Sequence, residues 1–358
     1  MSILLAIAIL ATLVLVHEAG HFLAARVQGI HVSQFSLGFG PALWKYQGDR
    51  TEYALRLFPL GGYVGFPDDD PESEIPDHDP DLLKNRPVLD RAIVISAGVI
   101  ANFGFAFLIL LLMVTTVGIP LADQPGIKIS QILGADTPAA VAGLRAGDVI
   151  LGVDGALIDN QLSNLDQFQA LVAQSPELHL QVERDRQTLE ITVIPQGKPG
   201  RIGVGLIWNG TPHRQPITNP VQALAIAGQE FYRLVSTTWD GLVQLVTNFA
   251  AISSQVSGPV AIVAAGAQLA QSNQAGLFDF TAIISINLAI INLLPLPALD
   301  GGQLLFLLIE WLRNGKPLPA KLQENVMQGG LVAILGLGLF MIARDSLSLI
   351  QQSGLMPL

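Results

Sequence analysis

The stretch LVLVHEAGHFLAA, residues 13–25, places two histidines and a glutamate inside an otherwise apolar run. His17, Glu18 and His21 form the pattern H-E-x-x-H. Because residues four positions apart lie on one face of a helix, both imidazoles can bind the same zinc ion. Glu18 is placed to accept a proton from water that the metal activates. A charged group in a membrane span costs about 2.5–3.5 kcal/mol, so three ionisable side chains there indicate a functional metal site.

The composition around this stretch is that of a membrane protein. Half of the 358 residues are hydrophobic and only 13% are charged, about half the charged share of a soluble globular protein. Four apolar runs, near residues 3–26, 92–118, 277–299 and 326–343, are each long enough to cross a hydrocarbon layer of about 30 Å. A block of soluble composition, residues 123–215, lies between the second and third runs. The sequence therefore predicts a polytopic α-helical membrane protein of about four transmembrane helices with one inserted β-rich domain.

Several classes of site are excluded by composition. The chain has no cysteine, so disulfides and thiolate metal sites are ruled out and any metal must bind His, Asp or Glu. The net charge of −10 is partly concentrated in residues 67–81, which we interpret as a solvated linker. No basic patch suits nucleic acid. The first residues, Met1 and Ser2, carry no basic side chain and the apolar run continues past the histidines, so we expect no cleaved signal peptide.

Lysine and arginine predict the orientation in the membrane. They are concentrated in two connections, between the first and second runs (Lys45, Arg50, Arg56, Lys84, Arg86, Arg91) and between the third and fourth (Arg313, Lys316, Lys321). Because positive charge marks the cytoplasmic side, we expect both connections there, with the termini and residues 123–276 outside. The active site would lie toward the cytoplasm, in a bacterial plasma membrane or a plastid membrane.

A β-hairpin is expected in the first of these connections. Residues 42–47 and 51–58 flank a Gly48-Asp49-Arg50 turn, and Gly61-Gly62 marks a second turn. We expect the hairpin to enter the membrane boundary, where a lipid-exposed strand edge is forbidden. Its edge would pair with an unwound substrate beside the histidines, with Tyr53 and Leu55 as substrate contacts.

The block outside the membrane contains TPAAVAGLRAGDVILGVDG, residues 137–155. It predicts a short helix over 138–142, a strand over 149–153 and a hairpin turn at Asp154-Gly155. LHLQVERD, TLEITVIP and RIGVGLIW predict further strands. Residues 137–155 resemble the PDZ pattern of bacterial proteases, so residues 123–212 are named the PDZ-like domain. The resemblance implies that it binds a peptide C-terminus in a groove supplied by residues 201–206, or excludes large substrates; a simple spacer is the alternative.

Residues 217–250 predict a helix that starts at Asn219-Pro220. Its charges favour an amphipathic helix at the membrane interface over a fifth span. The expected organisation is thus 1–122, the first half of a core with two spans; 123–212, the PDZ-like domain; 213–276, an interfacial helical linker; and 277–358, the second half of the core.

A third metal ligand is expected in INLAIINLLPLPALDGGQLL, residues 286–305. Asn287 and Asn292 interrupt the third apolar run, Pro295 and Pro297 break its helix, and Asp300 follows. The chain unwinds near the depth of the histidines, so Asp300 can complete a two-histidine, one-aspartate set that leaves a fourth position open for water. The alternative is that Asp300 only caps a helix.

Taken together, VHEAGH, FPLGGYV, the PDZ pattern, SGPVAI and NLLPLPALDGG resemble the site-2 protease family of intramembrane zinc metalloproteases, and most of all its regulator-of-sigma-E branch with plant and cyanobacterial relatives. The resemblance implies one zinc ion per chain and cleavage of transmembrane segments, in anti-sigma factors or remnant signal peptides. It implies His17, His21 and Asp300 as ligands and Glu18 as the catalytic base. It assigns Asn287, Asn292, Pro295 and Pro297 to substrate binding or to the shape of the site.

The second apolar run departs from the family pattern. It reads SAGVIANF, with Val99 where the family usually has proline, while Gly98 and Asn102 remain. This departure puts a local kink in doubt but not the chemistry. We expect Asn102 to contribute to substrate binding and to oxyanion stabilisation.

Two other classes of function fit part of the pattern. A metal carrier or sensor would use the same ligands without hydrolysis, and an inactive PDZ-bearing membrane scaffold would need no intact site. Glu18 discriminates among them, because a carrier does not need a general base beside its ligands. The sequence therefore predicts a protease.

Overall fold

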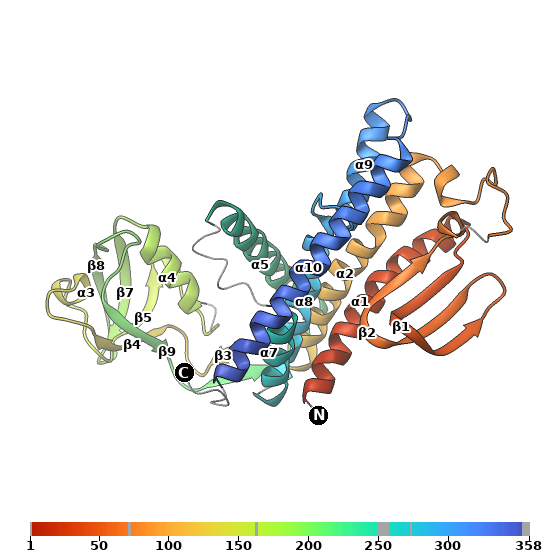
Figure 1. Ribbon diagram of the computed structural model, residues 1–358. Helices are drawn as coiled ribbons and strands as arrows, with labels where there is room; N and C mark the ends of the chain where they lie inside the picture. Colours follow the sequence, from red (N-terminus) through yellow and green to blue (C-terminus); the bar gives the residue numbers. More distant parts are fainter. Residues whose placement is uncertain (1, 71–72, 162–163, 249–257, 273, 353–358) are drawn as a thin grey trace. The chain divides into compact units, whose positions relative to one another are not determined.

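The computed structural model describes residues 2–70, 73–161, 164–248, 258–272 and 274–352 (Figure 1). Pro71, Glu72 and Ser257, which belong to stretches discussed above, lie outside the described residues. The chain divides into two compact units, Met1–Leu112 with Leu224–Leu358, and Met113–Ala223. The first unit holds the H-E-x-x-H stretch and the second holds the PDZ-like domain.

Four helices in the described part of the chain are long and apolar enough to cross a membrane. They are α1 (Ser2–Val27), α2 (Val88–Thr116), α8 (Gln274–Leu293) and α10 (Ala320–Gln352). None has a proline in its interior, so every helix can satisfy its backbone hydrogen bonds internally, as a lipid environment requires. The four predicted spans and the predicted fold class are confirmed.

The third span is interrupted where the prolines predicted a break. Helix α8 ends at Leu293, and α9 (Asp300–Leu312) begins after Pro295 and Pro297. Ala298 has a φ of 69°, which marks the reversal of the chain. The chain can pack tightly here because Gly301 has no side chain; a Cβ there would lie 2.2 Å from the carbonyl oxygen of Leu294. The break returns Asp300 toward the interior of the helical unit.

A small sheet follows α1, built from β1 (Gln34–Gln47) and β2 (Glu52–Gly65). Both strands bend, so the sheet has four segments. Residues 42–47 pair antiparallel with residues 52–56, as the predicted hairpin requires. Residues 34–37 lie between residues 52–55, with which they run parallel, and residues 62–65, with which they run antiparallel. The outermost segments are therefore 42–47 and 62–65.

This sheet refines one expectation and corrects another. Gly61 and Gly62 lie within β2, at the end of the bend where this strand reverses direction between residues 56 and 62, and Gly61 has a φ of 115°. The segment with Tyr53 and Leu55 is paired on both sides, so the expected open edge is not there. The reason is that β1 changes direction near Gly38 and Gly40, whose φ angles are 87° and 84° and favour glycine. The bend adds strand pairs that a single-hairpin interpretation cannot foresee.

Apolar and aromatic side chains attach the sheet to the helices. Ala25, Val64 and Val94 belong to one buried cluster, which joins the end of α1, the sheet and α2. Phe35 packs against both Phe22 of α1 and Tyr53, with ring centroids 5.1 and 6.3 Å apart. Tyr53 is thus part of an aromatic row within the sheet.

Helices α5, from residue 224 onward, and α7 also belong to this unit. The helix predicted from Asn219-Pro220 is α5 (Pro220–Thr247), and the side-chain oxygen of Asn219 accepts hydrogen bonds from the N–H groups of Val221 and Gln222 at 3.0 and 3.2 Å. Helix α7 (Pro259–Ser272) contacts α1, α8 and α10. Two short 3₁₀ helices, η1 (Pro67–Asp69) and η2 (Leu83–Asn85), lie in the acid-rich connection.

The second unit is a β-rich domain with two short helices. Its main sheet has the order β8-β7-β5-β4-β9, β6 pairs with β5, and a separate ribbon joins β3 to β10. The elements are β3 (Ile119–Ala122), β4 (Ile127–Ile132), α3 (Pro138–Val141), β5 (Val149–Val153), β6 (Ala156–Leu157), α4 (Asn164–Gln174), β7 (Leu178–Arg184), β8 (Gln187–Val193), β9 (Val204–Trp208) and β10 (Pro212–Gln215). Asp154 and Gly155 both have positive φ, as the predicted hairpin turn requires.

A buried ion pair lies in this domain. Nε of Arg184 donates to Oδ1 of Asp148, and its Nη2 donates to Oδ2, both at 2.7 Å. The backbone N–H of Arg145 also donates to Oδ2, at 2.8 Å. Burial raises the pKa of Asp148, but the hydrogen bonds from Arg184 and Arg145 outweigh it and hold that pKa below its ordinary value. Both carboxylate oxygens are therefore satisfied inside the domain.

Candidate metal centre

The two histidines of α1 face each other, as their spacing predicted. Their Nε2 atoms are 3.2 Å apart, and the rings meet edge to face with centroids separated by 4.7 Å. His17 is buried and His21 half-buried. Two imidazole nitrogens at this separation present their lone pairs to one point, which is the arrangement that a shared cation needs.

Asp300 supplies the third group at this point. Its Oδ2 lies 3.3 Å from Nε2 of His17 and 3.4 Å from Nε2 of His21. The three ligand atoms all lie within 4.8 Å of one another. Two imidazoles and one carboxylate form a donor set that catalytic zinc uses.

The hydrogen bonding of Asp300 tests whether a cation fits. Among the described residues, Oδ2 is a buried oxygen with no hydrogen-bond partner. Leaving such an acceptor unsatisfied costs about 1–3 kcal/mol, which a bound cation would remove. The N-cap of α9 is Leu299, and no side chain caps the helix. The helix-capping alternative for Asp300 is therefore wrong, and the donor set fits a metal.

Glycine at position 98 makes room for the two imidazoles. A Cβ at Gly98 would lie 2.3 Å from Nε2 of His21 and 2.8 Å from Cε1 of His17. Gly20 allows close packing on the other side of the contact, since its Cβ would lie 2.4 Å from the carbonyl oxygen of Ala97. The sequence interpretation named Gly98 only as a retained family residue and missed this steric reason.

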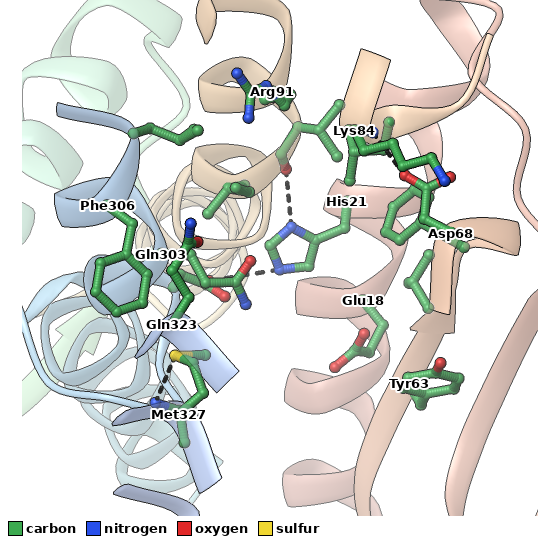
Figure 2. Close-up of a pocket in the computed structure, with 18 of the residues that line it drawn as sticks. Glu18, His21, Tyr63, Asp68, Lys84, Arg91, Gln303, Phe306, Gln323 and Met327 are labelled. Atoms are coloured by element: carbon green, nitrogen blue, oxygen red, sulfur yellow. Dashed lines mark hydrogen bonds and ion pairs between the residues drawn. The ribbon is translucent and has the colours of Figure 1, made fainter. Parts of the chain in front are cut away.

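Glu18 lies beside residues 62–65 of β2, and Figure 2 shows it near Tyr63 of this segment. A Cβ at Gly62 would lie 2.5 Å from Cγ of Glu18, and the Glu18 carboxylate lies against the backbone of Val64. The segment next to the proposed base is therefore 62–65. A side chain at position 62 would displace the carboxylate.

A cavity of about 800 Å³ connects these groups. The predicted ligands and the base line it together with polar side chains: His17, Glu18, His21, Asp300, Asp68, Lys84, Gln303 and Gln323. Figure 2 labels Glu18 and His21 among the side chains around this cavity. Arg91 and Glu310 also line it and form an ion pair, with Nη1 3.1 Å from Oε2. The two residues are 219 positions apart, so no local sequence pattern could have paired them. The cavity is wide and polar enough to hold water near the metal ligands.

The remaining predicted site residues are placed differently. The side-chain nitrogens of Asn102 and Asn292 lie 3.2 Å from Nδ1 and 3.3 Å from Nε2 of His17, respectively. Neither asparagine is among the residues that line the cavity, and the same holds for Tyr53, Leu55, Asn287, Pro295 and Pro297. Pro297 instead packs against α10, where a Cβ at Gly330 would lie 2.2 Å from its Cβ. The structure thus brings together the predicted ligands, the base and two of the three asparagines.

A second group of His and Asp side chains lies in the acid-rich connection. His31, Asp79 and Asp81 have ligand atoms within 4.8 Å of one another. However, Arg86 donates to Asp81 at 2.7 Å, and Oδ1 of Asp79 accepts from the backbone N–H of Asp81 at 2.8 Å. These carboxylates already have hydrogen bonds within the protein, whereas Oδ2 of Asp300 has none among the described residues.

Comparisons with known proteins agree with this geometry. Residues 5–337 match the model of peptidase family M50. A Nostoc protein whose name assigns it to the zinc metalloproteases is 56% identical over 357 residues, which are 98% of each chain. The chloroplastic membrane metalloprotease ARASP of Arabidopsis thaliana is 46% identical over 355 residues, covering 97% of this chain and 79% of that protein. The regulator of sigma-E protease RseP of Escherichia coli is 30% identical over 438 residues, covering 92% and 96%.

The fold and the site define a membrane metalloprotease. The matches show that the chain belongs to peptidase family M50, the site-2 protease family, and the names of its relatives identify zinc as the metal. Two solved PDZ domains also match 23% of this chain: that of HtrA3 bound to a phage-derived ligand (22% identity, TM-score 0.18, 64% of that chain) and that of an SdrC-like protein from Listeria monocytogenes (19%, 0.20, 88%).

Proposed function

We propose that this metalloprotease hydrolyses peptide bonds inside transmembrane segments of other membrane proteins, with one zinc ion held by His17, His21 and Asp300. The observation that carries the proposal is the convergence, within 4.8 Å, of Asp300 of α9 with two histidines of α1, a helix of membrane-span length. Peptide bonds that can reach such a site belong to substrates that are themselves in the membrane. Substrates of this kind include anti-sigma factors and remnant signal peptides.

Glu18 acts as the general base in this proposal. When bound, zinc lowers the pKa of a water molecule toward about 7 and polarises the scissile carbonyl group. The Glu18 carboxylate accepts the proton of the attacking water and later donates it to the amine that leaves. Its position beside His17, with the cavity in front of it, supports this role.

The substrate would bind as an extended strand along residues 62–65. A transmembrane helix hides its carbonyl groups in its own hydrogen bonds, so hydrolysis requires local unwinding. Residues 62–65 are an outermost segment of the sheet and lie directly beside Glu18. This support shifts the expected substrate strand from Tyr53 and Leu55 to residues 62–65. Asn292, close to Nε2 of His17, is the asparagine best placed to contact the substrate, while Asn287, Pro295 and Pro297 would shape the site from behind.

The PDZ-like domain offers a second place for a peptide. A pocket of about 300 Å³ is lined by Phe168 and Val172 of α4, by Leu206 of β9 and by residues 200–204. Strand β9 is the outermost strand of its sheet, which supports addition of a peptide strand whose C-terminus meets the loop at Arg201 and Gly203. We propose that this groove selects substrates with an exposed C-terminus.

The proposed orientation places the metal centre toward the cytoplasm and the PDZ-like domain outside. The lysine and arginine content of the two connections supports it. Helix α5 would lie at the interface, because Val221, Trp239 and Val246 expose apolar surface while Arg233 and Asp240 are also exposed.

The first test is cleavage of a tagged single-span substrate by purified protein in detergent. Wild type, Glu18→Gln and chelator-treated wild type would be compared, with bound zinc measured in each. Glu190→Gln, at an exposed position of β8, is the matched control. We expect Glu18→Gln to keep its zinc and lose about 10²–10⁴-fold in rate, and the control to cleave normally.

Two outcomes would contradict the proposal. Cleavage that survives in Glu18→Gln would remove Glu18 as the base. Zinc binding without cleavage of several substrates would instead favour a carrier or sensor.

A further inference from the structure

We infer that Asn102 is a positioning residue that sets the tautomer of His17: its side-chain oxygen accepts a hydrogen bond from Nδ1–H and leaves Nε2 free for zinc. The inference rests on the proposed function, in which His17 is a ligand. Asn102 was expected to contact substrate. In the structure Asn102 is completely buried in α2 and is not among the residues that line the cavity. Its amide faces Nδ1 of His17, while Nε2 of the same ring is directed at Asp300.

His21 shows how the site selects a tautomer. Its Nδ1 lies 2.8 Å from the carbonyl oxygen of Val94. A carbonyl oxygen can only accept a hydrogen bond, so Nδ1 of His21 carries the proton and Nε2 keeps its lone pair. That lone pair is on the atom 3.4 Å from Asp300. A backbone group behind the ring therefore prepares Nε2 of His21 as a ligand.

His17 needs the same tautomer, but among the described residues the hydrogen-bonding group at its Nδ1 belongs to a side chain and is not a backbone carbonyl. Its Nε2 is directed at the same carboxylate oxygen, 3.3 Å away, so binding the shared ion also requires the proton on Nδ1. The group 3.2 Å from this Nδ1 is the amide of Asn102. An amide has a donor end and an acceptor end of nearly equal size, and a half-turn about its Cβ–Cγ bond exchanges them.

The hydrogen bonding of Asn102 favours the acceptor end toward His17. Its Oδ1 is one of few buried side-chain atoms in the described part of the chain that lack a hydrogen-bond partner. Turning this oxygen to Nδ1–H gives it a partner and matches the zinc-binding tautomer. The backbone of Asn102 is held by Ser285 of α8, whose hydroxyl donates to its carbonyl oxygen at 2.8 Å. Asn102 is thus fixed between two helices behind His17 and does not reach the substrate.

The test compares zinc affinity in full-length wild type, Asn102→Leu and Asn102→Asp. Affinity would be measured by competition with a chromophoric chelator, and ligand geometry by the absorption spectrum of the cobalt(II)-substituted protein. Thr281→Val is the control, since Thr281 is also buried but donates only to Leu277 within its own helix. We expect Asn102→Leu to bind zinc about 10–100-fold more weakly with a changed cobalt spectrum. Asn102→Asp, which keeps an acceptor, should retain wild-type affinity, as should Thr281→Val.

Three results would overturn the inference. Wild-type zinc affinity and cobalt spectrum in Asn102→Leu, with slower cleavage, would show that Asn102 acts on substrate. Equal loss of zinc in Asn102→Asp and Asn102→Leu would show that Asn102 donates. If Asn102→Leu does not fold, the ¹⁵N chemical shifts of His17 in zinc-loaded wild type decide, and an unprotonated Nδ1 is the third contrary result. Failure of the proposed function is distinguishable, because wild type itself would then not bind zinc or not cleave.

Discussion

Asp300 in the helical unit and Asp148 in the PDZ-like domain are both carboxylates inside the protein, and they differ in what surrounds them. Asp148 has a side chain that is 1% exposed, and Arg184 and Arg145 donate to both of its oxygens. Asp300 has a side chain that is 15% exposed, and one of its oxygens has no hydrogen-bond partner. A buried carboxylate with hydrogen bonds to both oxygens stabilises the fold, whereas one with a free oxygen beside two imidazoles can bind a cation.

We expect the largest effect from a substitution of Asp300, whose Oδ2 has no hydrogen-bond partner among the described residues. Asp300→Asn should weaken zinc binding by more than about 100-fold, beyond the usual loss for a residue behind a ligand, and should abolish cleavage. The urea midpoint of the metal-free protein should change much less than the zinc affinity, because without zinc the only described side chains near Oδ2 of Asp300 are the imidazoles of His17 and His21, at 3.3 and 3.4 Å. Bound zinc and urea unfolding measure the two effects. A fall in metal-free stability with zinc retained would assign Asp300 to the structure.

Filling the space between the imidazoles with a methyl group tests the geometry of the metal centre without changing its donor atoms. Gly98→Ala puts a methyl group 2.3 Å from Nε2 of His21, so the ligands must move by a fraction of an ångström or more. A displacement of this size costs about 100-fold in rate. Gly104→Ala is the control on the same helix, since nothing lies within 4 Å of its Cβ. Zinc affinity and cleavage rate would be measured for both, and equal activity of the two variants would contradict the steric argument.

Removing the ion pair between Asp148 and Arg184 should lower the stability of the PDZ-like domain and leave the metal centre unchanged. Asp148→Asn removes the charge that Arg184 binds and should cost about 2–3 kcal/mol of domain stability. Urea unfolding would be followed by Trp208 fluorescence in a background where the other tryptophans, Trp44, Trp239 and Trp311, are phenylalanine. Asp185→Asn, exposed and adjacent to Arg184, should stay within about 0.5 kcal/mol. Loss of zinc in Asp148→Asn would be an unexpected link to the metal centre.

The smallest expected effect is a change in the stability of the PDZ-like domain with pH. Because the folded pKa of Asp148 lies below its ordinary value, its ionisation stabilises the domain above the ordinary pKa of about 3.9. That stabilisation is lost as the pH falls through the lower folded pKa. The urea midpoint reported by Trp208 should therefore fall with acid in the wild type. The fall should be shallower in Asp148→Asn, and identical slopes would contradict the assignment.

Local patterns were sufficient for much of the fold. The four spans followed from apolar length, the end of α8 from Pro295 and Pro297, and the start of α5 from Asn219-Pro220. In the PDZ-like domain the turn at Asp154-Gly155 followed from residue types that tolerate positive φ. Each of these features depends on neighbours in the chain, so a single sequence contains the information.

The strand that we propose to bind substrate could not be found from local patterns. The turn at Gly48-Asp49-Arg50 between residues 42–47 and 51–58 predicted one hairpin, and the hairpin exists. Its neighbours in the sheet come from bends near Gly38 and Gly40, and a bend of this kind changes which segment is outermost without changing the pattern. The segment beside Glu18 could therefore be found only in three dimensions.

The class of protein and the chemical groups of the site follow from residue types and their spacing, since a metal ligand can only be one of a few residue types and H-E-x-x-H places two of them on one helical face. Asp300 was also predicted as the third ligand from the sequence, but its distance from the histidines comes from the tertiary structure. Asp300 follows His17 by 283 positions and lies 3.3 Å from it, Gly98 leaves space for the imidazoles, and Asn102 lies behind one of them. Distances between helices depend on packing over the whole unit, and the order of residues along one helix does not contain them.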